Sequence, residues 1–123
     1  MRTILSMAAV AVVLGMPALA QDQATYKVGE NGVKAPALIR EVKPNYTSDA
    51  MKRQVQGVVE MSTVVKTDGS VGPIEITRSL DPDLDEEAMK ALRQWKFRPG
   101  TKDDQAVNVE VNIEMTFTLR KKG

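Results

Sequence analysis

The sequence contains no cysteine and no histidine, and only five of its 123 residues are aromatic: one Trp, two Tyr and two Phe. Without cysteine, the chain forms no disulfide and offers no thiol nucleophile. Without histidine, Ser-His-Asp and Cys-His catalytic arrangements and the usual zinc ligand sets are excluded. An enzyme would have to rely on carboxylates, lysine or serine alone, and nothing in the sequence arranges them. We therefore expect a protein that is not an enzyme and that has no cofactor and no metal ion.

A strong charge of either sign is also lacking. The chain has 17 basic and 16 acidic side chains and a formal net charge of +1. A nearly neutral domain has no general electrostatic attraction to nucleic acid or to an anionic membrane. We expect neither as a partner.

The one long apolar run lies at the N-terminus. Arg2 precedes an apolar stretch from Ile4 to Leu14, and Ala18-Leu19-Ala20 forms a small-residue cleavage site. This pattern predicts a signal peptide over residues 1–20, with the mature chain starting at Gln21. The alternative is an uncleaved inner-membrane anchor through residues 3–20, because a membrane span needs about 20 apolar residues. Pro17 followed by the small residues favours cleavage.

The remaining chain divides into a leader and one domain. Residues 21–34 are polar, contain Gly29 and Gly32 and have little to bury, so they predict a flexible leader. Residues 35–120 predict a single domain, and a chain of about 100 residues can bury a core without disulfides or metal.

Turn and capping residues indicate the order of elements in this domain. We expect an extended segment over residues 35–42 and a helix over 48–54, capped by Thr47 or Ser48 and followed by Gly57 as the left-handed C-terminal residue. Strands over residues 57–66 and 71–79 flank the hairpin signal Asp68-Gly69. Pro73 indicates that the second of these strands lies at a sheet edge.

An acidic segment opens the second predicted helix. Asp81, Asp83 and Asp85 have the spacing that begins an EF-hand calcium loop, which also needs Gly at position six and Glu at position twelve. Glu86 and Leu92 occupy those positions, so calcium is not expected. The segment instead predicts Asp83 as the helix cap with Glu86 completing a capping box.

The last strand has the most regular pattern in the chain. From Val107 to Arg120 every odd position is apolar and every even position is polar. This alternation predicts a half-buried strand about 45 Å long. Because the average strand has only about six residues, part of it should extend beyond its neighbour. The unpaired backbone there is either a docking edge or an aggregation hazard that Glu110, Glu114 and Arg120 suppress.

These elements predict an α+β fold: a three-stranded antiparallel sheet with two helices packed on one face. The expected core residues are Met51, Val55, Val59, Met61, Ile74, Ile76, Leu84, Ala88, Leu92, Trp95, Phe97, Val109, Val111, Ile113 and Phe117.

Four motifs in one order carry a family resemblance. They are Pro44-Asn45-Tyr46-Thr47, Thr67-Asp68-Gly69-Ser70-Val71, the Leu84-to-Ala88 helix leading into Trp95-Lys96-Phe97-Arg98-Pro99, and the strand ending in Phe117-Thr118-Leu119. Over residues 35–120 the chain resembles the C-terminal domain of the TonB family, the energy transducers that contact outer-membrane receptors from the periplasm.

The resemblance implies a periplasmic binding module that recruits the TonB box of an outer-membrane receptor as an added strand. The edge implied for that peptide comprises Val107, Asn108, Val109, Glu110, Val111 and Asn112. Lys43, Asn45 and Tyr46 lie in the segment that neighbours the box in the family. That segment reads Gln-Pro-x-Tyr-Pro in the family, whereas Lys43 and Thr47 replace the glutamine and the second proline here.

The sequence departs from a full transducer. We find no Pro-rich spacer, and the short leader reaches only about 40 Å when extended. The leading hypothesis is therefore an exported, stand-alone TonB-like domain that binds receptor boxes. The alternative is an envelope scaffolding domain that uses the same edge to self-associate, as a homodimer for example, without transport coupling.

Overall fold

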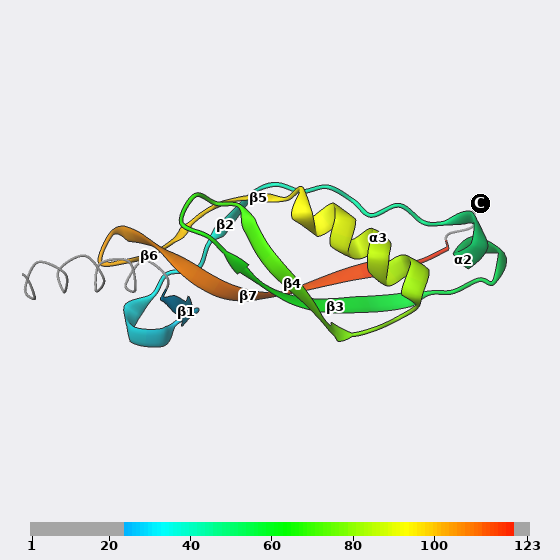
Figure 1. Cartoon of the computed structure of the whole chain (residues 1–123), viewed down its shortest axis with the longest axis horizontal. Coiled ribbons are helices and arrows are strands. Elements are labelled where there is room, and N and C mark those ends of the chain that lie inside the picture. Colours follow the sequence, from blue (N-terminus) through cyan, green and yellow to red (C-terminus); the bar gives the residue numbers. More distant parts are fainter. Residues whose placement is uncertain (1–23, 120–123) are drawn as a thin grey trace, which may run out of the picture.

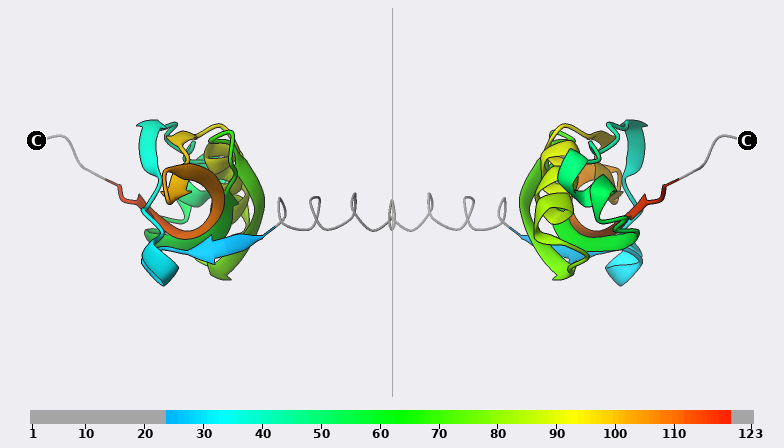
Figure 2. Two further views of the ribbon diagram at one scale, coloured as in Figure 1. Left: turned by 90° about the vertical axis from the view of Figure 1, so that its left-hand side faces the viewer. Right: turned by 90° about the vertical axis from the view of Figure 1, so that its right-hand side faces the viewer.

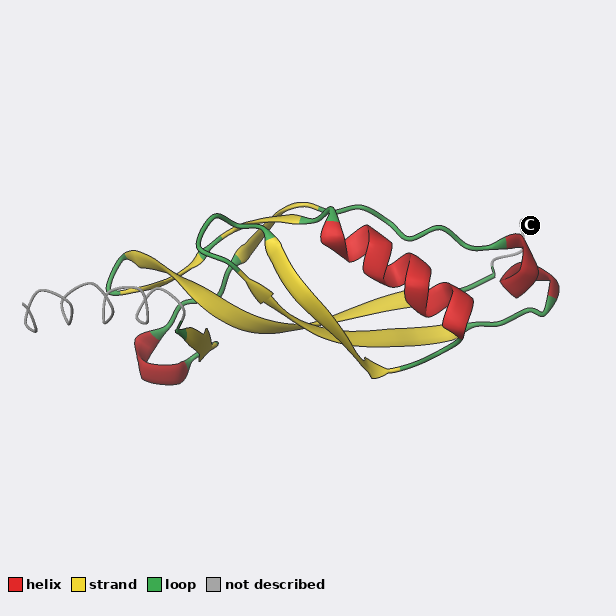
Figure 3. Ribbon diagram, viewed as in Figure 1, coloured by secondary structure: helices red, strands yellow, loops and turns green. Residues whose placement is uncertain are grey.

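The computed structural model describes residues 24–119, so the predicted signal peptide lies outside the described residues. A five-stranded sheet forms the centre, with the order β1-β7-β3-β4 and β6 paired with β7 (Figures 1 and 3). Its strands are β1 (Thr25–Lys27), β3 (Gly57–Val65), β4 (Val71–Arg78), β6 (Gly100–Lys102) and β7 (Gln105–Phe117). A second sheet joins β2 (Ala37–Arg40) to β5 (Lys96–Arg98).

The long strand β7 organises the main sheet. It pairs antiparallel with β3 without interruption, from Gly57 opposite Phe117 to Val65 opposite Val109. β4 lies on the far side of β3, at the end of the sheet, as Pro73 predicted. The expectation of only three strands was wrong. β1 and β5 have three residues each and pair with strands far away in the sequence. β6 also has three residues and forms a hairpin with β7 through Asp103 and Asp104, which both have positive φ.

The helix α3 (Pro82–Arg93) covers one side of the sheet, which curves around the core in the end-on views of Figure 2. Its buried side chains follow the three- and four-residue spacing of one helical face: Leu84, Ala88, Ala91 and Leu92. The short helix α2 (Ser48–Lys52) lies at one end of the molecule and buries only Ala50 (Figure 1).

Most of the predicted core is buried or half-buried, but Met51 is 45% exposed. The prediction was wrong there because α2 is a single five-residue turn, and Ala50 rather than Met51 faces inward. The nine predicted core residues that are buried are Val59, Met61, Leu84, Ala88, Leu92, Trp95, Phe97, Val109 and Phe117.

The helix ends differ from the predicted ones in two places. Asp81, not Asp83, caps α3, since its carboxylate accepts hydrogen bonds from the N–H groups of Asp83 (3.0 Å) and Leu84 (3.3 Å). Pro82 then occupies the first helical position, where no N–H is needed. After α2, Gln54 adopts the left-handed conformation expected near Gly57, with φ of 57°.

The predicted flexible leader contains ordered structure. Residues 25–27 form β1, and a short 3₁₀ turn, η1 (Glu30–Gly32), follows. Thr25, Tyr26 and Lys27 pair in parallel with Asn108, Val109 and Glu110 of β7. A polar sequence does not reveal this order, because the backbone makes these contacts and the side chains bury little.

Candidate functional site

The edge of β7 opposite β3 has two parts. Asn108, Val109 and Glu110 are paired with β1. Residues 111–117 have β3 on one side, and no strand between residues 24 and 119 pairs with their other side. We call residues 111–117 the free edge.

The structure divides the partner-binding residues expected from the sequence. Val107 pairs with Gly100 of β6. Asn108, Val109 and Glu110 lie under β1, and only Val111 and Asn112 belong to the free edge. In the described structure, residues 107–110 of the expected edge therefore already have a strand partner in β6 or β1, which the sequence does not show.

The direction of the backbone groups follows from two hydrogen bonds. The Lys27 N–H donates to Glu30 Oε1 at 2.9 Å, so it points away from β7. The Ala24 carbonyl accepts from Asn108 Nδ2 at 3.3 Å, so it points toward β7. Because backbone groups alternate along a strand, Tyr26 presents its N–H and C=O to β7.

The same alternation applies to β7. Tyr26 lies opposite Val109 in a parallel pair. In such a pair the inward-facing residue bonds to the two neighbours of its partner, so Asn108 and Glu110 direct their N–H and C=O groups toward β1. Asn112 and Glu114 lie two and four residues after Glu110, so their N–H and C=O groups also point away from β3, into the free edge.

A groove of about 300 Å³ lies beside the far half of the free edge. Lys43, Tyr46 and Trp95 line this groove. Asn45 instead lines a separate hollow with Glu87 and Lys90. The residues lining the groove are Glu41, Lys43, Pro44, Tyr46, Trp95, Glu114, Met115, Thr116, Phe117 and Thr118.

The 41–46 segment is fixed at both ends. Trp95 Nε1 donates to the Val42 carbonyl at 2.8 Å. The Tyr46 hydroxyl donates to the Val55 carbonyl, and its ring meets Phe117 edge-on with centroids 5.4 Å apart. The groove is thus built from the helix-strand junction, the segment before α2 and the end of β7.

The sequence patterns did not identify Glu41, Trp95 or residues 114–117 as site residues. The unbroken alternation through Phe117 was the signal that could have extended the edge. A second hollow marks the other end of the free edge, where β1 stops, and is lined by Lys27, Val28, Glu110, Val111 and Asn112.

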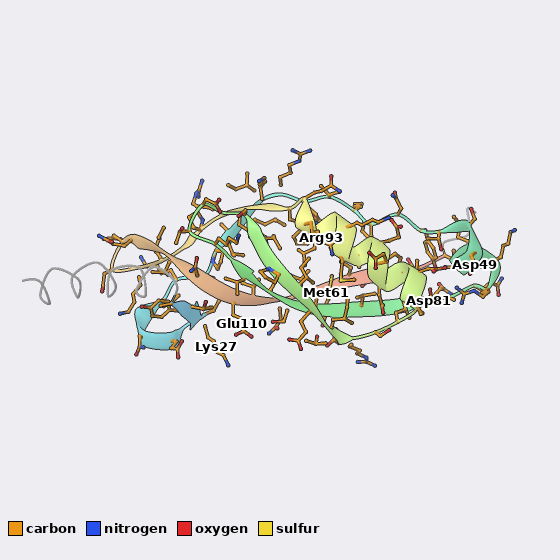
Figure 4. All side chains as sticks on the ribbon, in the orientation of Figure 1. Lys27, Asp49, Met61, Asp81, Arg93 and Glu110 are labelled. Atoms are coloured by element: carbon orange, nitrogen blue, oxygen red, sulfur yellow. The ribbon has the colours of Figure 1, made fainter. Side chains whose placement is uncertain are left out.

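The solvent face of the sheet beside the free edge is acidic. Glu60 lies directly opposite Glu114. Arg78 offsets part of this negative charge, because its Nη1 lies 3.5 Å from Glu60 Oε2. Ser62 Oγ donates to Glu110 Oε2 at 3.4 Å. Figure 4 shows Glu110 and Lys27 next to each other where β1 ends, consistent with their pairing.

The acidic segment around α3 joins the two helices. Arg53 Nη1 lies 3.0 Å from Asp81 Oδ1, and its Nη2 lies 2.9 Å from Asp49 Oδ2. The Arg53 guanidinium lowers the pKa of the Asp81 carboxyl, and Asp81 in turn raises the pKa of Arg53. In Figure 4, Asp49 and Asp81 lie near each other at the end of the molecule that holds α2.

None of the helices between residues 24 and 119 has both the length and the apolar character needed to span a bilayer.

The sequence profile described as "Gram-negative bacterial TonB protein C-terminal" matches residues 42–119. The chain belongs to this family. The resemblance inferred from the four motifs is thereby confirmed, and the matched region contains α2, β3, β4, α3 and β7, which carry the free edge and its groove.

Three curated TonB relatives are similar over part of their length. Protein tonB2 of Pseudomonas aeruginosa is 32% identical over 77 residues, which are 62% of this chain and 28% of that protein. Protein TonB of Xanthomonas campestris pv. campestris is 34% identical over 77 residues, which are 62% of this chain and 34% of that protein. Protein TonB of Vibrio cholerae is 32% identical over 89 residues, which are 71% of this chain and 36% of that protein. The chain thus spans about a third of the relatives it matches.

The fold is shared with a solved TonB domain. The solution NMR structure of the Pseudomonas aeruginosa TonB CTD superposes with a TM-score of 0.60 at 21% identity, covering 79% of this chain and 96% of that one. The α+β fold with a sheet and two helices is confirmed.

Proposed function

We propose that this TonB-family domain is a non-catalytic, periplasmic binding module in transport across the outer membrane. It engages TonB-dependent receptors by adding their box peptide as a strand to the free edge. The observation that carries the proposal is the run of residues 111–117, which is paired with β3 on one side only. Membership in the TonB family and the similarity to TonB proteins support the connection to TonB-dependent transport.

The free edge has the size of a short peptide. Seven residues in a strand extend over about 23 Å. Each backbone hydrogen bond that a peptide makes there contributes about 0.5–1.5 kcal/mol net. Side chains entering the groove beside residues 114–118 then contribute selectivity.

The segment before α2 supplies the side wall of this site. Lys43 lines the groove and makes no ion pair among the described residues, so its ammonium is available to a peptide carboxylate or carbonyl. Tyr46 is already bonded to Val55 and shapes the wall. Among the residues expected from the sequence, we assign peptide contact to Lys43, Tyr46, Val111 and Asn112.

Proline substitution tests the mechanism. Asn112→Pro deletes an N–H that points into the free edge. It should lower the affinity for a TonB-box peptide at least about tenfold, which corresponds to about 1.4 kcal/mol of binding free energy. Asn112→Ala keeps the backbone and should change the affinity less than about threefold. Thermal melts of both variants establish that the fold is intact, and fluorescence anisotropy gives the affinities.

Glu114→Pro is the second probe, because its N–H points the same way as that of Asn112. If both proline variants remain folded and bind the peptide like the parent, strand addition at the free edge is wrong.

A second candidate function is self-association in an envelope scaffold. It is favoured by β2, where Leu38 and Ile39 are 45% and 64% exposed on a strand that pairs, among the described residues, only with β5. Light scattering of the purified protein separates the two functions, since scaffolding requires a concentration-dependent increase in mass without any receptor peptide.

We also propose that residues 1–20 direct export and are removed, leaving residues 21–34 as the leader and residues 35–120 as the binding domain. Intact mass of the protein from a periplasmic extract tests this: a chain starting at Gln21 is expected, and membrane-bound protein retaining Met1 would support the anchored alternative.

A further inference from the structure

We infer that β1 is a built-in competitor for the receptor-peptide edge: Thr25–Lys27 occupies residues 108–110 of β7 and leaves when a longer peptide binds. The inference rests on the proposed function, since it concerns the same edge. It adds an occupant from the chain itself and a means of controlling the length of the site.

β1 occupies the edge in the manner proposed for the receptor peptide. It lies on the side of β7 opposite β3, directly in line with the free edge. Its contact with β7 is a backbone pairing, centred on Tyr26 opposite Val109. Backbone pairing is largely independent of sequence, so another extended peptide can replace it.

The attachment of β1 is weak. Thr25 and Lys27 are exposed, Tyr26 is half-buried, and Val28, just beyond the strand, is 52% exposed. Side-chain contacts at β1 include the Asn108 hydrogen bond to the Ala24 carbonyl and the Lys102 ammonium 5.6 Å from the centre of the Tyr26 ring. Segments with so little burial open at low free-energy cost.

A hinge separates β1 from the core. Gly29 and Gly32 have φ of 84° and 78°, and no residue of η1 is buried. Immediately afterwards Val33 is only 4% exposed, and Lys34 exchanges backbone hydrogen bonds with Thr101 at 2.8 and 3.3 Å. The chain can therefore release β1 and η1 as far as Val33 without disturbing the core.

Release lengthens the edge. With β1 in place, a peptide can pair with residues 111–117, about 23 Å of strand. Without β1 the edge starts at Asn108 and measures about 33 Å. A long peptide then binds with an affinity reduced by the fraction of molecules in which β1 is open.

A disulfide lock tests the inference directly. Lys27 and Glu110 are paired neighbours and the chain has no cysteine, so Lys27→Cys with Glu110→Cys creates a single bridge that holds β1 in place. Oxidised and reduced samples of this one protein are titrated with a ten-residue TonB-box peptide and with a six-residue version of it. A non-reducing gel establishes that the bridge is within one chain.

We expect oxidation to lower the affinity for the ten-residue peptide at least about tenfold and to leave the affinity for the six-residue peptide unchanged. Equal binding of the ten-residue peptide to both samples would overturn the inference and leave the proposed function standing. A bridge between two chains would also overturn it, because β1 would then pair with a second copy. If the unmodified protein binds neither peptide, the proposed function itself fails.

A matched pair of prolines provides an independent test. Tyr26→Pro removes an N–H that faces β7, whereas Thr25→Pro removes one that faces away from it. Tyr26→Pro should raise the affinity for the ten-residue peptide at least about threefold, and Thr25→Pro should change it by less than about twofold. Unchanged affinity in Tyr26→Pro would show that β1 does not compete.

Discussion

Asp81 connects the two helices of the domain. Its carboxylate caps α3 through the N–H groups of Asp83 and Leu84 and at the same time pairs with Arg53, the residue that ends α2. The hydrogen bond from Arg53 is the main cause of the lowered Asp81 pKa. One buried carboxylate thus links the start of α3 to the end of α2.

Because the Asp81 pKa is lower in the folded than in the unfolded chain, its ionised form stabilises the fold above about pH 4, and this stabilisation is lost as the pH falls further. Asp81→Asn keeps a capping oxygen but loses the charge. It should melt at a lower temperature than the parent at pH 7, with a difference that narrows below about pH 4. Asp83→Asn, whose carboxylate is half exposed and 3.9 Å from Arg53, is the control with a smaller effect. A difference independent of pH would contradict this prediction.

Trp95 closes the junction between α3 and β5. It is 7% exposed, and its ring centroid lies 6.1 Å from that of Phe97. Its indole N–H donates a hydrogen bond to the Val42 carbonyl. Trp95→Ala should cost about 3–5 kcal/mol of unfolding free energy, since the cavity lies between two fixed backbones. Trp95→Phe retains most of the packing and should cost clearly less. Chemical denaturation measures both, and a loss below about 1 kcal/mol for Trp95→Ala would contradict the assigned role.

At the scale of elements, the β3–β4 turn fits against β5. Gly69 has φ of 85°, and an added Cβ would lie 2.0 Å from the Phe97 carbonyl oxygen. The Phe97 N–H also donates to the Gly69 carbonyl at 3.0 Å. The hairpin turn therefore positions the strand that follows Trp95.

Gly69→Ala should destabilise the domain by more than the roughly 1–2 kcal/mol of left-handed strain alone. Gly29→Ala is the matched control, because Gly29 has φ of 84° but no atom within 4 Å of the added Cβ. Urea unfolding of both variants isolates the contact with Phe97. Equal losses would show that the turn does not depend on this close approach.

At the scale of the whole molecule, stability should be concentrated where β7 meets β3. Amides of Val111 and Ile113 face β3 and should exchange slowly with deuterium, whereas those of Asn112 and Glu114 face the free edge and should exchange fast. Tyr26 should also exchange faster than Val111, because β1 opens without the core. Hydrogen exchange followed by NMR measures this alternation, and strong protection of Asn112 would show that the free edge is covered.

The sequence by itself determined the local features of the domain. The alternation after Val107, the hairpin at Asp68-Gly69 and the spacing of Leu84, Ala88 and Leu92 identified β7, the β3–β4 turn and the buried face of α3. These features depend on residues close in the chain, so a local pattern suffices to reveal them.

Tertiary structure decided which backbone groups stay unpaired. β1 is 83 residues away from its partner on β7, and neither segment carries a side-chain pattern that specifies the other. The pairing of Thr25 with Asn108 is made by main-chain groups common to all residues. For the same reason only the folded chain shows that the unpaired edge comprises residues 111–117, beside a groove lined by Tyr46, Trp95 and Phe117. An edge exists only relative to what already covers it, and that is a property of the folded chain.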